Sequence, residues 1–173
     1  MADFRNYHCP IHQFNCEYMM DWLLTWDEHA LLAVNGLSTP WLDVVMGWLS
    51  NKIAWVPVYA ILLLGLIQLL GWKRALLAAL LAIPLILLAD QATSGLLKPW
   101  VARPRPCHIP ELRSVLHLVN NKCGGPFGFA SSHAANFFAL ATYLGFFFRQ
   151  RWRYSPIIFL AVASLVAFSR VYL

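Results

Sequence analysis

Residues 53–97 read IAWVPVYAILLLGLIQLL, then GWKR, then ALLAALLAIPLILLADQATSGLL, and this stretch decides the fold. A helix needs about 20 predominantly apolar residues to cross the hydrocarbon core of a bilayer. The first apolar run covers residues 53–70 and the second covers residues 75–97. Pro84 is expected to kink the second helix without ending it, because the apolar run continues on both sides of it. The stretch therefore predicts two spanning helices joined by a short basic turn.

Two later stretches, residues 129–148 and 155–173, are also apolar and are separated by a second basic turn. We therefore predict an all-α, polytopic transmembrane helix bundle with about four spans in this chain. The composition agrees, since 60% of the 173 residues are hydrophobic and 12% are charged, which excludes an ordinary soluble domain. The net charge of +5 lies in short segments between helices rather than along one face, which argues against a nucleic acid partner.

The N-terminal part differs from the spans. Residues 22–50 are rich in Trp and Leu but are interrupted by charged residues, Gly36 and Pro40, so no run reaches spanning length. We predict two short amphipathic helices that lie in the membrane interface and are joined near residues 36–40, with an imperfect span as the alternative. The chain then divides into an N-terminal tail with interfacial helices, residues 1–50, and a membrane domain, residues 51–173.

The four cysteines fall into two pairs. Cys9 and Cys16 lie near His12, but this spacing matches no zinc-binding pattern, so no metal site is predicted. Cys107 and Cys123 bracket one loop, and they can form a disulfide if that loop faces an oxidising compartment. Four free thiols are the alternative, because the sequence does not show whether the Cα atoms come close enough for a bond.

The orientation follows from the basic turns. Residues 71–74 and 149–154 carry basic but no acidic side chains, and they are therefore assigned to the cytoplasm. The loop from residue 98 to 128 then faces outward. Its own basic residues oppose this rule unless they serve another purpose, and binding an anion would be one. These residues are Lys98, Arg103, Arg105, Arg113 and Lys122.

The start of this loop, KPWVARPRP at residues 98–106, is the first candidate for an anion site. Its prolines fix the backbone and remove donors, so Arg103 and Arg105 are expected on a stiff, non-helical segment. Guanidinium groups held in this way can bind phosphate oxygens in a bidentate manner. The alternative is that these cations only mark the positive border of a span.

Two more polar clusters are expected at the same face of the membrane, because successive spans alternate in direction. Ser131, Ser132 and His133 open the third span, and one of the serines can cap that helix, which leaves its remaining N–H groups for an anion. Arg170 lies inside an apolar run, where a charge is costly in lipid and usually points into a polar cavity. A side chain that snorkels to the interface is the alternative for Arg170.

These clusters carry a family resemblance. Lys98, six residues and then Arg105-Pro106 is similar to the first motif, Lys-x6-Arg-Pro, of the type 2 phosphatidic acid phosphatase superfamily, which includes the vanadium haloperoxidases. Ala130-Ser131-Ser132-His133 resembles the second motif, Pro-Ser-Gly-His. Ser169-Arg170 is similar to the opening of the third, Ser-Arg-x5-His-x3-Asp. The bacterial membrane members that act on lipid phosphates or undecaprenyl diphosphate are the nearest in character, and a complete member is expected to have six spans.

The resemblance implies hydrolysis of a lipid phosphomonoester or diphosphate through a phosphohistidine intermediate, without metal or other cofactor. The substrate would be a polyprenyl diphosphate or a phospholipid phosphate in the bilayer, while the oligomeric state is left open. It implies a bacterial plasma membrane location, with the site facing the periplasm or the cell exterior. His133 would be the general acid. The residues expected to bind the phosphate are Lys98, Arg105, Ser131, Ser132 and Arg170.

The sequence departs from the family pattern in three places. Ala130 replaces the proline of the second motif and Ser132 replaces its glycine. The nucleophilic histidine and the aspartate of the third motif are missing, because three residues follow Arg170. We therefore expect an incomplete membrane phosphatase domain that is inactive in this form. A non-catalytic membrane protein that binds phospholipid through the same residues is the alternative.

Overall fold

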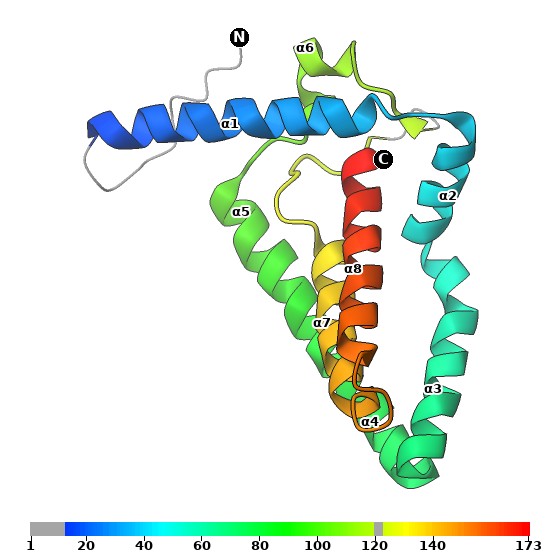
Figure 1. Ribbon diagram of the computed structural model, residues 1–173. Helices are drawn as coiled ribbons and strands as arrows, with labels where there is room; N and C mark the ends of the chain where they lie inside the picture. Colours follow the sequence, from blue (N-terminus) through cyan, green and yellow to red (C-terminus); the bar gives the residue numbers. More distant parts are fainter. Residues whose placement is uncertain (1–12, 120–122) are drawn as a thin grey trace.

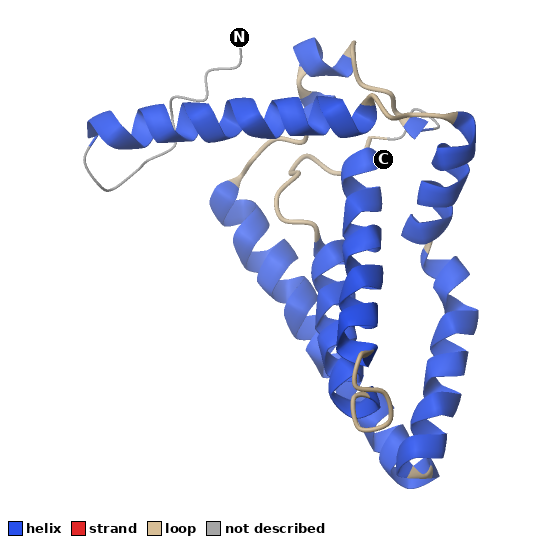
Figure 2. Cartoon of the chain, viewed as in Figure 1, coloured by secondary structure: helices blue, strands red, loops and turns tan. Residues whose placement is uncertain are grey.

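The computed structural model describes residues 13–119 and 123–173, and within these ranges it is almost entirely helical (Figure 2). The one β-bridge among the described residues joins Pro104 to Phe127. The predicted all-α helix bundle is therefore confirmed. In chain order the helices are α1 (Gln13–Asn35), α2 (Pro40–Ser50), the 3₁₀ turn η2 (Lys52–Trp55), α3 (Val56–Leu70), α4 (Trp72–Asp90), the π-helical segment η3 (Gln91–Leu97), α5 (Lys98–Val101), the 3₁₀ turn η4 (Pro106–His108), α6 (Pro110–Arg113), α7 (Ser132–Phe148) and α8 (Ser155–Tyr172).

Helices α3, α4, α7 and α8 form an antiparallel bundle that widens toward one end (Figure 1). The turns between α3 and α4 and between α7 and α8 lie at the narrow end, while α1 crosses the wide end. As a result, the end of α5, the start of α7 and the end of α8 all lie at the wide end, beneath α1. This is the meeting of polar clusters that the alternating spans predict.

In the described part of the chain, three helical stretches are long and apolar enough to cross a membrane, Lys52–Leu70, Trp72–Val101 and Ser155–Tyr172. The fourth predicted span, α7, has 17 residues, or about 26 Å at the standard helical rise, and packs between α4 and α8. Close contact between α7 and α8 depends on Gly145, because a Cβ there would lie 3.1 Å from the Cα of Pro156.

The buried core lies toward the narrow end of the bundle. Leu66, Ala75, Leu144 and Phe148 are buried together where α3, α4 and α7 meet. Most apolar side chains of the spans are instead exposed in the isolated chain, as expected for surfaces that face lipid. The hydroxyl of Tyr143 donates to a backbone carbonyl of α4 at 2.8 Å, so that a polar atom within the bundle is paired. The bundle thus closes at one end and leaves the other open for a site.

One predicted boundary was wrong. The second span does not end before Lys98, because η3 and α5 continue the helix to Val101. Pro84 lies inside α4 and does not end the helix, as predicted. A π-helical turn fits an extra residue into a helix and often occurs near functional sites. Lys98 therefore lies on a helix rather than in a loop, whereas Arg103 and Arg105 lie on the non-helical segment that was predicted.

The N-terminal prediction was confirmed in its main feature, two helices joined near residues 36–40. Helix α1 begins earlier than expected, at Gln13, and crosses the ends of the spans as an interfacial helix would (Figure 1). Helix α2 differs, because it runs on toward α3 rather than across the bundle (Figure 1). The possible cluster around Cys9 and His12 lies outside the described residues.

Candidate active site

The six residues predicted for the site line one cavity of about 1320 Å³ at the wide end of the bundle. They come from separate parts of the chain, since the ends of two helical stretches, the start of a third and an intervening loop meet there. A cavity of this volume is larger than one phosphate group requires. These residues are Lys98, Arg105, Ser131, Ser132, His133 and Arg170. Their roles in phosphate binding stay predictions.

Arg105 is held by a short antiparallel pairing of two loop segments. Its N–H donates to the carbonyl of Pro126 at 2.8 Å, and Gly128 N–H donates to the carbonyl of Arg103 at 2.9 Å. Pro104 lies between these two bonds, where its missing N–H costs nothing. The disulfide between Cys107 and Cys123 closes the same loop, with Cα atoms 6.0 Å apart. The backbone on both sides of Arg105 is therefore fixed.

The Arg105 side chain packs against the backbone of Gly124. A Cβ at Gly124 would collide with the guanidinium group of Arg105, whereas one at Gly125 would meet no atom within 4 Å. The Nε atom of Arg105 is buried and has no hydrogen-bond partner among the described residues. One terminal nitrogen makes a long contact of 3.5 Å with the carbonyl of Phe127. Most of the donors of Arg105 are thus left for a ligand in the cavity.

We expect Gly124→Ala to weaken binding of vanadate, a phosphate mimic, by about three- to tenfold, the worth of one or two displaced hydrogen bonds. The colliding group is the end of a flexible side chain, so thermal unfolding should change little. Isothermal titration calorimetry in detergent micelles measures the affinity, and Gly125→Ala is the matched control. Equal affinities of the two variants would contradict the packing described for Arg105.

The start of α7 is organised by its two serines. Ser131 is the N-cap, and its hydroxyl oxygen accepts from Ala134 N–H at 3.4 Å. The hydroxyl of Ser132 instead pairs with that of Ser94 on η3 at 2.6 Å, so it links α7 to the π-helical segment. The sequence placed Ser132 among the phosphate ligands, and this pairing engages part of its hydrogen-bonding capacity.

His133 is partly buried and lies against Phe137, with ring centroids 5.0 Å apart. Its Nε2 atom is buried and has no hydrogen-bond partner among the described residues. Arg170 donates to the hydroxyl of Ser50 on α2 and lines the cavity. This placement favours the prediction that Arg170 points into a polar cavity over the alternative that it snorkels to the interface. An imidazole nitrogen without a partner among the described residues and a guanidinium group are therefore both present at the cavity.

The charges of the cavity are unbalanced. Among the described residues, Lys98, Arg105 and Arg170 form no ion pair with a carboxylate. Asp27 on α1 also lines the cavity, but it pairs with Arg103, the cation that lies between the two basic residues of the first motif. Cations without counter-ions are costly to gather, and a bound anion would offset that cost. The cavity is thus suited to a group with several negative oxygens.

Comparison with known proteins decides the family. Residues 76–173 match the model of the PAP2 superfamily, and the match includes all six predicted site residues. The chain belongs to the PAP2 superfamily. The resemblance read from the three motifs is therefore confirmed.

Two curated relatives of this PAP2 protein are similar over most of its length. A lipid A 4'-phosphatase of Bacteroides thetaiotaomicron is 38% identical over 157 residues, which are 90% of this chain and 68% of that protein. A lipid A 4'-phosphatase of Porphyromonas gingivalis is 32% identical over 154 residues, 89% of this chain and 64% of that protein. The chain thus spans about two thirds of the length of these relatives.

A solved structure confirms the fold class. The crystal structure of a transmembrane PAP2-type phosphatidylglycerolphosphate phosphatase from Bacillus subtilis aligns with a TM-score of 0.60 and 24% identity. The alignment covers 88% of this chain and 74% of that chain. At this identity the likeness shows a shared fold, a helical PAP2 membrane bundle.

The sequence did not predict that α1 and α2 contribute side chains to the cavity of this PAP2 protein. Asp27 and Asn35 on α1 and Ser50 on α2 line the cavity, although the sequence predicted those helices as a separate interfacial segment. The available signal was polar side chains within otherwise apolar, Trp-rich helices. Such residues usually face protein rather than lipid.

Two loop histidines have structural partners in this PAP2 chain. His108 Nε2 lies 3.1 Å from the carbonyl oxygen of Gly124, the residue that packs against Arg105. His108 also lies close to Cys107 and Cys123, but both sulfurs are used in the disulfide and are not available to a metal. His117 pairs with Asp43. Neither histidine lines the cavity, in agreement with their position outside the motifs.

Proposed function

We propose that this PAP2 protein is a membrane lipid phosphatase. The observation that supports the proposal is the gathering of Lys98, Arg105 and Arg170, without carboxylate partners among the described residues, around a cavity that also contains His133. A phosphate group carries several oxygens that can accept from all three cations at once. The same cations would stabilise the charge that develops as the phosphorus becomes five-coordinate.

The proposed mechanism assigns one task to each group. Lys98, Arg105 and Arg170 hold the phosphate oxygens, and the capped start of α7 adds backbone N–H groups. His133 donates a proton to the oxygen that leaves with the lipid. In the family pattern the attacking histidine follows Arg170 after five residues, and an aspartate orients it. Ligand binding is the direct test of the residues that line the cavity.

We propose a lipid A-type phosphomonoester as the substrate, a phosphate on a sugar that carries acyl chains. The names of the two curated relatives support this choice over a polyprenyl diphosphate or a phospholipid phosphate. The cavity also has apolar walls next to the cationic groups, which suits a substrate with a bulky, partly apolar leaving group. The residues of these walls include Leu31, Val34, Leu116 and Leu118.

We further propose a bacterial plasma membrane location, with the cavity on the periplasmic or outer side. The disulfide between Cys107 and Cys123 lies at the cavity end and requires an oxidising compartment. The basic turns at residues 71–74 and 149–154 lie at the opposite end of the bundle (Figure 1). Basic turns favour the cytoplasmic side.

The test uses protein produced from the complete natural reading frame, purified in detergent micelles. We expect phosphate release from lipid A that persists in EDTA and falls by about 10²- to 10⁴-fold in His133→Ala, the range for loss of a general acid. His29→Ala is the control, because His29 is exposed on α1 and does not line the cavity. Unchanged release by folded His133→Ala, or loss of release with the chelator, would contradict the mechanism. Saturable binding without any release would favour the non-catalytic alternative.

A further inference from the structure

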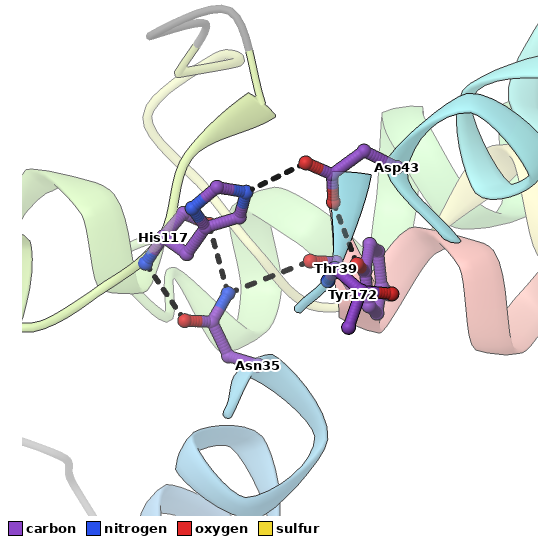
Figure 3. Close-up of polar contacts among 5 residues, drawn as sticks. All are labelled: Asn35, Thr39, Asp43, His117 and Tyr172. Carbon is purple, nitrogen blue, oxygen red and sulfur yellow. Dashed lines mark hydrogen bonds and ion pairs between the residues drawn. The ribbon is translucent and has the colours of Figure 1, made fainter. Parts of the chain in front are cut away.

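A group of hydrogen-bonded residues ties the last turn of α8 to α1 and α2 (Figure 3). We call it the Asp43 cluster, and it consists of Asn35, Thr39, Asp43, His117 and Tyr172. Tyr172 is 1% exposed. Its hydroxyl donates to Asp43 Oδ1 at 2.6 Å and accepts from Thr39 N–H at 3.2 Å. The phenol oxygen is therefore fixed from two directions by α2 and by the residue that precedes it.

Asp43 is the acceptor at the centre of the cluster. Its second oxygen, Oδ2, accepts from His117 Nε2 at 2.9 Å, so both carboxylate oxygens are engaged. The hydrogen bonds from Tyr172 and then from His117 lower the pKa of Asp43, which keeps the carboxylate ionised at neutral pH. An ionised carboxylate can only accept, so Tyr172 must donate and His117 must carry a proton on Nε2.

Asn35 extends the cluster to the loop at residue 117. Its side-chain oxygen accepts from His117 N–H at 2.7 Å, and its side-chain nitrogen donates to the carbonyl of His117 at 2.9 Å. The same nitrogen lies 3.5 Å from the carbonyl oxygen of Tyr172 (Figure 3). Asn35 is 7% exposed, and losing these bonds would leave buried polar groups unpaired. The cluster therefore joins parts of the chain that are far apart in sequence.

The cluster borders the cavity, and one of its members, Asn35, lines it. Neither Asp43 nor Tyr172 lines the cavity, but Arg170 and Val171, which immediately precede Tyr172, do line it. On α2, Asp43 and Ser50 are seven residues apart and so share one face of the helix. Asp43 holds Tyr172 and Ser50 holds Arg170, which means that one face of α2 fixes the last turn of α8 at two points.

We propose that Asp43 and Tyr172 are positioning residues for Arg170. This inference rests on the proposed function, since it concerns the phosphate that Arg170 would bind. The two residues set the rotation of the last turn of α8 against α2, and the guanidinium group then reaches the cavity with a neutral partner, Ser50. Arg170 therefore remains charged and without a carboxylate partner among the described residues at the place where an anion would bind.

The experiment is a double-mutant cycle on vanadate affinity, measured by isothermal titration calorimetry in detergent micelles. Tyr172→Phe keeps the buried ring and removes the hydroxyl, and it should weaken binding by about three- to tenfold, the worth of one hydrogen bond as an affinity ratio. In protein that already carries Arg170→Gln, the same change should have no further effect, because residues that act through one another are not additive. Asp43→Asn should weaken binding in the same direction.

The controls separate positioning from general damage. Tyr154→Phe is the matched control, because Tyr154 lies at the opposite end of α8 and is exposed. Thermal unfolding identifies any variant that has lost its fold. Wild-type affinity in Tyr172→Phe, or an equal loss in the presence and absence of Arg170→Gln, would overturn the inference while the proposed anion site stands. Wild-type affinity in Arg170→Gln alone would instead overturn the proposed function, and this inference with it.

Discussion

Replacing Arg105 with glutamine should weaken vanadate binding by about 10- to 150-fold, the range expected for losing hydrogen bonds from a charged group. The structure gives Arg105 this weight because its backbone is fixed on both sides and its guanidinium group has no carboxylate partner among the described residues. Its buried Nε atom also has no protein acceptor in those residues. Calorimetric titration with vanadate in detergent micelles measures the change.

Two variants make this result specific to Arg105. Arg113→Gln removes an equal charge from the same loop, but Arg113 is exposed and does not line the cavity, so its affinity should stay near that of the wild type. Arg105→Lys should give an intermediate loss, because lysine keeps the charge without the planar fork of donors. If Arg113→Gln and Arg105→Gln weaken binding equally, the effect is one of net charge rather than of the site.

Removing the disulfide should have the second large effect. The bond between Cys107 and Cys123 closes a loop with a sequence separation of 16 and holds Gly124 beside Arg105. Closing a loop of about 15 residues constrains the chain by about 3 kcal/mol. In the double variant Cys107→Ser, Cys123→Ser, the loop has to become ordered when the ligand binds, and this ordering reduces the net free energy of binding. We therefore expect vanadate affinity to fall by more than about tenfold.

A reductant provides the internal control for the disulfide. Dithiothreitol should lower the affinity of the wild type toward that of the double variant and leave the double variant itself unchanged. The double variant should also unfold at a lower temperature than the oxidised wild type, since the disulfide constrains the unfolded chain. Full affinity in the double variant would show that the pairing around Pro104 holds Arg105 without help.

The sequence predicts the part of the site that the spans and the first motif contribute, because that part depends on local patterns. Apolar runs mark the spans, spans alternate in direction, and so Lys98, His133 and Arg170 must meet at one end. The motif spacing adds Arg105. Hydropathy does not record which polar side chains meet across the bundle, and for that reason the pairing of Ser94 with Ser132 could not be predicted.

The other part of the site depends on contacts between distant segments. Asn35 meets His117 across 82 positions of sequence, and Tyr172 meets Asp43 across 129. No local periodicity encodes such pairs, so the N-terminal helices could be predicted as helices but not as a wall of the cavity. The separate domain at residues 1–50 stays a prediction, although α1 and α2 contribute side chains to the cavity.

The length of the second span bears on the depth at which the proposed site would lie in the membrane. Trp72–Val101 has 30 residues, or about 45 Å of helix, whereas the hydrocarbon core is about 30 Å thick. With Trp72, Lys73 and Arg74 at the opposite border, the surplus of about 15 Å carries η3 and α5 out of the acyl chains. With the helix close to the bilayer normal, Lys98 would then lie within the headgroup layer. A lipid phosphate would meet the cavity at the depth it already occupies in the leaflet, without being drawn out of the membrane.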